Sequence, residues 1–91
     1  MKPRITFSIA ANGTLEMYFN EAGRQKFIQE LSRLNEQHEH FHFAPADNES
    51  QLDVSTRPYH SQDRVMEFGK VLFRTDDWDK KHYPHVMDDA S

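Results

Sequence analysis

In the segment His38–Phe43, three histidines alternate with Glu39 and two phenylalanines, and this alternation is the strongest constraint on the fold. Successive side chains of a β-strand point to opposite faces, so a strand here places three imidazoles on one face and two phenyl rings on the other. We therefore predict that Phe41 and Phe43 point into a hydrophobic core and that the imidazoles form a polar or solvent-facing ridge. The ridge consists of His38, His40 and His42.

The size and composition of the chain limit both its architecture and its chemistry. With 91 residues it forms one domain with a thin core, since such a chain buries roughly 60–65% of the surface that it exposes when unfolded. It contains no cysteine, which excludes disulfides, thiolate zinc sites and cysteine nucleophiles. Neither an apolar leader nor a run of about 20 apolar residues is present, so we expect a cytoplasmic protein with no membrane partner.

Charge is distributed unevenly along the chain. Residues 76–91 contain five acidic and two basic residues, residues 1–75 contain ten acidic and nine basic residues, and the formal net charge is −4. Nucleic-acid binding normally requires a basic stripe, and the sequence shows none, so we expect no nucleic-acid partner. An acidic C-terminal segment favours a basic partner protein instead.

Two alternating segments near the N-terminus predict a β-hairpin. Apolar residues occupy every second position from Ile5 to Ile9 and again from Leu15 to Phe19. The dipeptide Asn12-Gly13 lies between them and readily adopts the positive φ angles of a two-residue hairpin turn. The prediction is therefore two antiparallel strands joined by a tight turn.

A single helix is predicted after this hairpin. The side chain of Asn20 can cap the first turn by accepting a backbone N–H bond, and Glu21 suits the positive end of the helix. Gly23 is a poor helix former, which indicates either a frayed start or a close approach to another backbone. Glu30 is assigned to the polar side of the helix, where it pairs with Arg33. The apolar residues predicted to cover the sheet are Phe27, Ile28, Leu31 and Leu34.

Three further strands are predicted after the helix. The first is the histidine-containing segment, and a short second strand directs Leu52 and Val54 inward. The last strand covers residues 64–75, where a β-bulge at Gly69 resets the alternation and keeps four large apolar residues in the core. These four residues are Met66, Phe68, Val71 and Phe73.

The predicted fold is α+β, with a single helix packed on a mostly antiparallel sheet in the order β-β-α-β-β-β. This domain covers residues 1–75. From Asp76 onward apolar residues are too sparse for a core element, so residues 76–91 are expected to form an acidic, mobile C-terminal tail. Within this tail, Trp78 either anchors a partner or folds back on the domain.

Several short motifs recur in the order that a known family has. They are Asn20-Glu21-Ala22-Gly23 at the start of the helix, Leu31 and Leu34 at its end, His40-Phe41-His42-Phe43, and Leu52–Val54 followed by a final strand. Over roughly residues 3–75 the chain thereby resembles the immunity protein 32 family of bacterial polymorphic toxin systems. The resemblance implies a small cytosolic domain that neutralises a cognate toxin by binding it, with no catalytic residues.

The histidine ridge leaves a metal-binding or metal-sensing domain as the alternative function. Neighbouring same-face residues of a strand lie about 6.6 Å apart, so His40 can share an ion with either His38 or His42. His38 and His42 are about 13 Å apart, which is too far for one tetrahedral centre. A third ligand must therefore come from His60, His82, His85 or a carboxylate brought near by folding, and a solvated histidine face is the competing interpretation.

The main prediction is a binding protein and not an enzyme. No serine lies in a nucleophile-elbow pattern, and the three glycines are too far apart to form a phosphate-binding loop. We expect a protein partner, a monomer or weak homodimer, and no cofactor, metal or catalytic residue. A third possibility is a subunit that adds an exposed strand edge to a partner or to its own copy. The expected partner contacts, with the acids pairing to basic toxin residues, are His40, His42, Arg57, Tyr59, His60, Asp76, Asp77 and Trp78.

Overall fold

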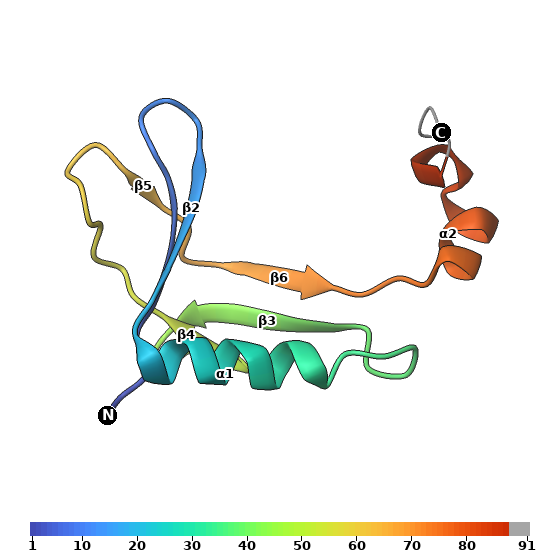
Figure 1. The fold of residues 1–91 in the computed structure, drawn as a ribbon, viewed down its shortest axis with the longest axis horizontal. Helices are drawn as coiled ribbons and strands as arrows, with labels where there is room; N and C mark the ends of the chain where they lie inside the picture. The colour runs from blue at the N-terminus through green and yellow to red at the C-terminus, as the bar shows by residue number, and fades with distance from the viewer. Residues whose placement is uncertain (88–91) are drawn as a thin grey trace.

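The computed structural model describes residues 1–87 and shows an α+β domain with two helices and six strands (Figure 1). The α+β class is confirmed, whereas the single helix and the single sheet of the prediction are wrong. Neither helix of the described part combines the length and apolar composition needed to cross a bilayer. The elements are β1 (Ile5–Ile9), β2 (Leu15–Phe19), α1 (Glu21–Ser32), β3 (His40–Pro45), β4 (Leu52–Val54), β5 (Arg64–Val65), β6 (Gly69–Leu72), α2 (Asp76–His82) and the 3-10 turn η1 (Pro84–Met87).

The strands form two three-stranded sheets, ordered β2-β1-β5 and β4-β3-β6. Neighbouring strands are antiparallel except β3 and β4, which are parallel. Two backbone hydrogen bonds of 2.7 Å link β1 of the first sheet to the segments that follow β4 and β5. The Ser55 N–H donates to the Ile5 carbonyl, and the Met66 N–H donates to the Phe7 carbonyl. The β1–β2 hairpin therefore stands at one end of the β3–β6 pair, while α1 runs alongside β3 (Figure 1).

The predicted hairpin is confirmed, but its turn is one residue longer than expected. The Ala10 N–H donates to the Thr14 carbonyl and the Gly13 N–H to the Ala10 carbonyl, both at 2.8 Å. Residues 11–13 therefore form the loop, and only Gly13 among them has a positive φ, of 90°. Asn12 contributes in another way, because its side-chain oxygen accepts the Thr14 N–H at 3.0 Å.

Asn20 caps α1 as predicted and also holds the start of the chain. Its Oδ1 accepts the N–H groups of Gly23 at 2.7 Å and Arg4 at 2.9 Å, while its Nδ2 donates to the Lys2 carbonyl at 2.9 Å. A Cβ at position 23 would meet the Arg4 carbonyl oxygen and the Ile5 side chain. Glycine therefore lets the first turn of α1 approach the start of β1, which is the close approach that the sequence indicated.

The hydrophobic core lies where the hairpin, α1 and the second sheet meet. The ring of Phe7 is central: its centroid lies 4.7 Å from that of Phe43, 5.9 Å from that of Phe27 and 6.3 Å from that of Phe19, all edge to face. These three neighbours belong to β3, α1 and β2, so one side chain joins four elements. The buried apolar residues of this core are Ile5, Phe7, Phe41, Leu52 and Val54.

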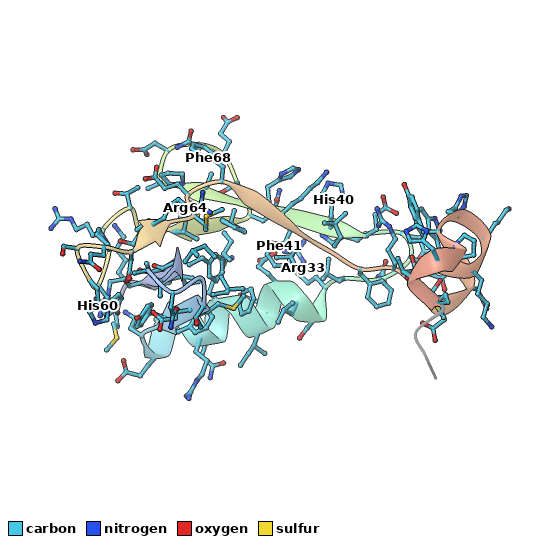
Figure 2. All side chains as sticks on the ribbon, turned by 90° about the horizontal axis from the view of Figure 1, so that it is seen from above. Arg33, His40, Phe41, His60, Arg64 and Phe68 are labelled. Carbon is cyan, nitrogen blue, oxygen red and sulfur yellow. The ribbon has the colours of Figure 1, made fainter. Side chains whose placement is uncertain are left out.

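The alternation predicted for the histidine segment is confirmed for its last four residues. Phe41 is fully buried and points toward α1, whereas the side chain of His40 lies on the opposite face of β3 (Figure 2). His38 lies in the preceding loop, because the side chain of Asn35 accepts the His38 N–H at 2.8 Å and holds a turn there. The histidine ridge therefore consists of His40 and His42 alone.

The predicted helix is confirmed, but a different face of it is buried. Ile28 and Leu31 are 49% and 40% exposed, whereas Glu30 is 2% exposed. Each residue advances by about 100° around a helix, so position 28 lies about 140° around the helix from position 23. Because position 23 contacts β1, position 28 faces away from the sheets. The residues that face the sheets are Gly23, Phe27, Glu30 and Leu34.

Glu30 is stabilised at its buried position by two cations of the same helix. Lys26 Nζ lies 3.1 Å and Arg33 Nη1 3.7 Å from Glu30 Oε2, so the predicted pair with Arg33 is confirmed. The second carboxylate oxygen, Oε1, is buried and has no hydrogen-bond partner among the described residues. The aliphatic parts of these long side chains let the charged ends reach solvent while the carboxylate stays covered.

The predicted final strand is wrong as a continuous element, because it divides into β5 and β6. The chain leaves the edge of β1 and joins the edge of β3 at Gly69, which pairs with Phe43. Gly69 is not a bulge: a Cβ there would meet the Phe43 ring, so the glycine makes room for it. Met66 and Val71 contact the core as predicted. Two predicted core residues are exposed instead: Phe68, in the crossing between the sheets, at 64%, and Phe73, directly after β6, at 39%.

The segment after residue 75 was predicted to be an acidic, mobile tail without a core element, and the structure shows a short helix there that contains no buried residue. Thr75 caps α2 by accepting the Trp78 N–H on its Oγ1 at 3.1 Å. Acidic residues occupy the first turn of this helix and basic residues its last turn, an arrangement that the helix dipole favours at both ends. Residues 88–91, also assigned to the tail, lie outside the described residues, and the mobility of the tail stays a prediction.

We expect Gly23→Ala to destabilise the protein although alanine is the better helix former. The added methyl group meets the Arg4 carbonyl, a backbone atom that moves only with β1. Because the obstacle is backbone, we expect the upper part of the usual overpacking cost, about 2–3 kcal/mol. The propensity gain of about 1 kcal/mol reduces this to a net loss of about 1–2 kcal/mol. Denaturant unfolding measures this, and Gln25→Ala at an exposed position of the same helix is the control, within about 0.5 kcal/mol of the unaltered chain. Equal stability of the two variants would contradict the close approach.

Candidate functional site

The residues predicted as partner contacts lie in four separate regions. His60 lies at one end of the molecule, beside Tyr59, and α2 with three of the predicted residues lies at the other end (Figure 2). The two histidines of β3 lie between them, and Arg57 lines a groove beside β4. The fold therefore does not gather these residues into one surface.

Residues 74–87, here called the C-terminal arm, project from the body of the protein (Figure 1). The radius of gyration is 15.4 Å, whereas a compact domain of this length has about 12 Å. Neither α2 nor η1 contains a buried residue. The base of the arm is held at Glu39, whose carbonyl accepts the Phe73 N–H at 2.7 Å and whose Oε2 lies 3.4 Å from Arg74 Nη1. The arm is thus fixed at one end and exposed beyond it.

Trp78 is the centre of an aromatic cluster on this arm. Its ring centroid lies 4.4 Å from that of His82 and 5.4 Å from that of Tyr83, and the Arg74 guanidinium carbon lies 4.5 Å from it. These ring and cation–π partners all belong to the arm, so within residues 1–87 the indole does not fold back on the core. Tyr83 and Val86 are 51% and 53% exposed. The arm therefore presents ordered aromatic and apolar groups to the surroundings.

Tyr59 and His60 belong to a group of polar residues on the outer face of the first hairpin. The Tyr59 ring stacks on that of Tyr18 at 3.8 Å and 10°. Beside this stack, one ligand atom each of Glu16, His60 and Asp63 lies within 4.8 Å of the others. We call Glu16, His60 and Asp63 the acid–histidine cluster. His60 Nδ1 lies 3.4 Å from Asp63 Oδ2, and the Tyr18 hydroxyl donates to Glu16 Oε1 at 2.8 Å.

Glu16 and Tyr18 were not among the predicted site residues. Both occupy the polar positions of an alternating strand, which is also the pattern of an ordinary solvent-facing side. The loop between β4 and β5 covers that side in the structure and brings Tyr59 and His60 onto it. The only signal in the sequence was the concentration of Tyr, His and Asp in that loop.

Glu16 raises the pKa of Tyr18 to about 12. The largest cause is the hydrogen bond from the phenol to the Glu16 carboxylate, followed by burial of the hydroxyl and by the negative charges of Glu16 and Asp63. Each of these disfavours the tyrosinate: ionised Tyr18 could no longer donate to the Glu16 carboxylate, would be less well solvated and would lie beside other anions. Tyr18 therefore stays a neutral hydrogen-bond donor that orients the carboxylate.

The histidine ridge is a pair of adjacent rings on the outer face of β3. The centroids of His40 and His42 lie 5.0 Å apart with the ring planes at 88°. Their partners across the sheet are Leu72 and Lys70 of β6. Among residues 1–87, the group with three possible metal ligands is the acid–histidine cluster and not this pair.

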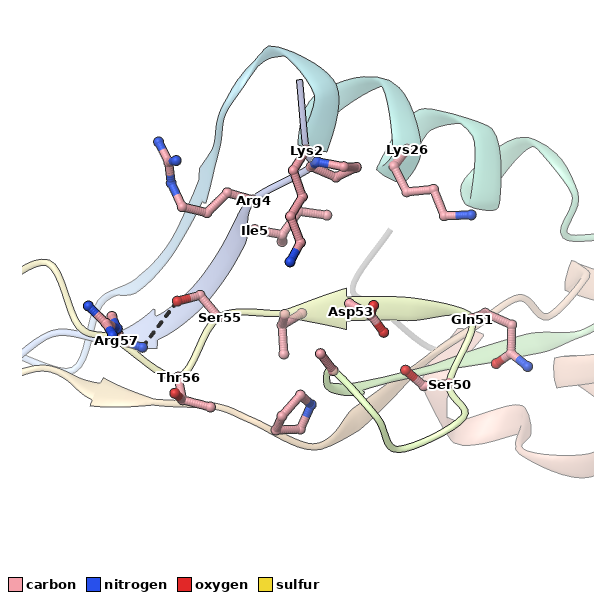
Figure 3. A pocket seen from close by; sticks show the side chains of 14 residues that line it. Lys2, Arg4, Ile5, Lys26, Ser50, Gln51, Asp53, Ser55, Thr56 and Arg57 are labelled. Atoms are coloured by element: carbon pink, nitrogen blue, oxygen red, sulfur yellow. Dashed lines mark hydrogen bonds between the residues drawn. The ribbon is translucent and has the colours of Figure 1, made fainter.

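Arg57 lines a groove of about 870 Å³ between the N-terminal segment, α1 and β4 (Figure 3). Lys2, Arg4 and Lys26 also line this groove, together with one acid, Asp53. Lys26 pairs with a glutamate of α1, whereas none of the other three cations forms an ion pair within the described part of the chain. The fold thus assembles a basic surface from segments that show no basic stripe in the sequence.

No family model, curated protein or solved structure matches this chain. The resemblance to the immunity protein 32 family therefore stays a prediction from the short sequence motifs.

We expect Tyr18 to ionise about two pH units above an ordinary tyrosine, and the protein to lose stability between pH 10 and 12. The unfolded tyrosine loses its proton near pH 10 and the folded one near 12, so the unfolded state binds fewer protons in this interval. The stability that neutral Tyr18 contributes through its environment is therefore complete below pH 10 and is lost as the pH rises through 12. Ultraviolet difference absorbance of tyrosinate follows the ionisation, and unfolding at several pH values follows the stability.

Glu16→Gln removes the carboxylate charge and should return the pKa of Tyr18 toward 10. Glu21→Gln, at an exposed position of α1, removes the same charge elsewhere and should leave the titration unchanged. Identical tyrosinate titrations of the unaltered protein and Glu16→Gln would refute the role assigned to Glu16.

Proposed function

We propose that this chain is a small, non-enzymatic protein-binding domain and that its C-terminal arm is the main contact with the partner. The exposure of the arm supports this proposal. The accessible surface is 6836 Å², whereas a compact protein of this mass exposes about 5500 Å². The excess, on the order of 1000 Å², is similar to the roughly 800 Å² that one protein contributes to an interface of standard size.

The side chains of the arm are those that contribute most to protein interfaces. Trp, Tyr and Arg are the residue types most enriched among energetically dominant contacts, and the arm carries Arg74, Trp78 and Tyr83. The cation–π contact and the stacked His82 already restrict the Trp78 rotamer. Binding through a restricted indole loses less side-chain entropy than binding through a free one.

The charges of the arm favour a partner with a basic surface. Asp76 and Asp77 lie at the exposed first turn of α2, and Asp79 follows in the same turn. Acidic groups beside an aromatic anchor steer a basic partner toward it and fix its orientation. Lys80 and Lys81 lie at the other end of the helix, so the arm distinguishes one direction of approach from the other.

The family resemblance adds a biological role to this binding surface. In that role the protein acts in the cytosol and neutralises a bacterial toxin by covering its active site. The acidic turn of α2 pairs with basic residues of the toxin, while Trp78 occupies a pocket on it. The histidine pair and the loop with Tyr59 and His60 lie on other faces of the molecule, so they lie outside the main contact that we propose.

Trp78→Ala is expected to weaken binding to the toxin encoded beside this gene by about 30-fold or more, since truncating a dominant interface residue costs about 2 kcal/mol or more. Calorimetric titration of an inactivated toxin measures the affinity. Ile28→Ala, which also truncates a half-exposed apolar residue but on α1, should leave the affinity unchanged. Circular dichroism should show the same fold for both variants, since neither residue lies in the core.

Two outcomes would count against this function in different ways. Unchanged affinity in Trp78→Ala and in the double variant Asp76→Asn/Asp77→Asn would remove the arm from the interface. Continued killing by the co-expressed toxin, despite abundant soluble protein, would reject the neutralising role itself.

A further inference from the structure

We propose that the acid–histidine cluster binds a divalent transition-metal ion such as Zn²⁺. The cluster joins two segments, since Glu16 lies on β2 whereas His60 and Asp63 lie in the loop before β5. One oxygen or nitrogen of each residue already lies within 4.8 Å of the others. The proposal is independent of partner binding by the C-terminal arm, which lies at the other end of the molecule.

The distances between the donor atoms suit a single ion. Ligand bonds of about 2.1 Å at tetrahedral angles place two donors about 3.4 Å apart. His60 Nδ1 and Asp63 Oδ2 lie 3.4 Å apart without any adjustment. The side chain of His60 is 71% exposed, so its ring can rotate to complete the site. Donors within 4.8 Å need to approach by at most about 1.4 Å to reach that separation.

The charges in the cluster favour a bound cation. The side chain of Asp63 is only 4% exposed and lies close to the Glu16 carboxylate. No lysine or arginine among the described residues forms an ion pair with either carboxylate. The Glu16 carboxylate is only partly buried, but two neighbouring carboxylates repel each other, and a divalent ion between them removes this repulsion.

A buried hydroxyl without a partner lies under the same side of the hairpin. Ser8 is fully buried, and its Oγ has no hydrogen-bond partner in the described part of the chain. Ser8 pairs directly with Glu16 across β1 and β2, so the two side chains point to the same face of the sheet. A buried polar atom is normally hydrogen-bonded, and an ion or its bound water at Glu16 provides a partner for this one.

The surroundings support and hydrate such an ion. The Tyr18 hydroxyl donates to Glu16 Oε1 at 2.8 Å, and outer hydrogen bonds of this kind orient carboxylate ligands. The cluster lines an open cavity of about 730 Å³, which leaves space for water as a fourth ligand. The site therefore has three protein ligands, an orienting donor and an open position.

The donor types select the class of metal. Two carboxylate oxygens with one imidazole nitrogen suit Zn²⁺ and neighbouring first-row ions, whereas Mg²⁺ and Ca²⁺ prefer oxygen ligands throughout. A bound ion would connect β2 with the loop that carries Tyr59. Since it binds the folded arrangement and not the unfolded chain, it would also stabilise the protein against heat.

Calorimetric titration of the untagged, full-length protein with ZnCl₂ tests the site. We expect one Zn²⁺ per chain and a higher melting temperature with Zn²⁺ than with Mg²⁺ at the same concentration. His60→Ala and Glu16→Gln should each weaken Zn²⁺ binding by about tenfold or more, and their metal-free melting temperatures show whether they fold. The matched control is His40→Ala/His42→Ala, which removes the exposed histidine pair of β3 and should bind Zn²⁺ as the unaltered protein does.

Three results would overturn the proposal. The first is the absence of Zn²⁺ binding by the folded protein. The second is unchanged affinity in His60→Ala. The third is loss of binding in His40→Ala/His42→Ala with retention in His60→Ala, which would place the ion on the histidine strand instead.

Discussion

The contacts of the Phe7 ring hold the four main elements of this fold together. This side chain of β1 meets aromatic rings from β2, α1 and β3, and all three contacts are edge to face. Such pairs contribute about 0.5–1.5 kcal/mol each beyond the burial of apolar surface. Folded domains are stable by only about 5–15 kcal/mol, so three contacts at one residue are a substantial share. The hairpin, the helix and the second sheet are stable together because they share this ring.

The exposed chemistry of the chain lies in segments that this aromatic junction does not need. The C-terminal arm begins where β6 ends, and the loop between β4 and β5 crosses the outer face of the hairpin. The arm carries Trp78 with its stacked neighbours, and the loop carries His60 and Asp63. Neither segment contributes a side chain to the core cluster. A small domain can in this way vary its binding groups without repacking its interior.

Local patterns were sufficient to predict the first hairpin, the cap at Asn20 and the outward position of His40, because alternation and capping depend on neighbouring residues. The rotation of α1 was not predictable from apolar spacing, since it is decided by the contact of Gly23 with the distant start of β1. The acid–histidine cluster depends on strand register in the same way, because Glu16 and His60 are far apart in the chain. Helix α2 was overlooked because it has no apolar stripe; its N-cap and the charges at its two ends stabilise it instead.

The amide of Asn20 makes the first residues of the chain part of the fold. It donates to the Lys2 carbonyl and accepts the Arg4 N–H, although both of these side chains are exposed. Without residues 1–4 the amide would keep its bond within α1 and lose both bonds to the start of the chain. Proteolytic trimming of this short N-terminal segment would therefore loosen the corner between strand and helix without removing a single core side chain.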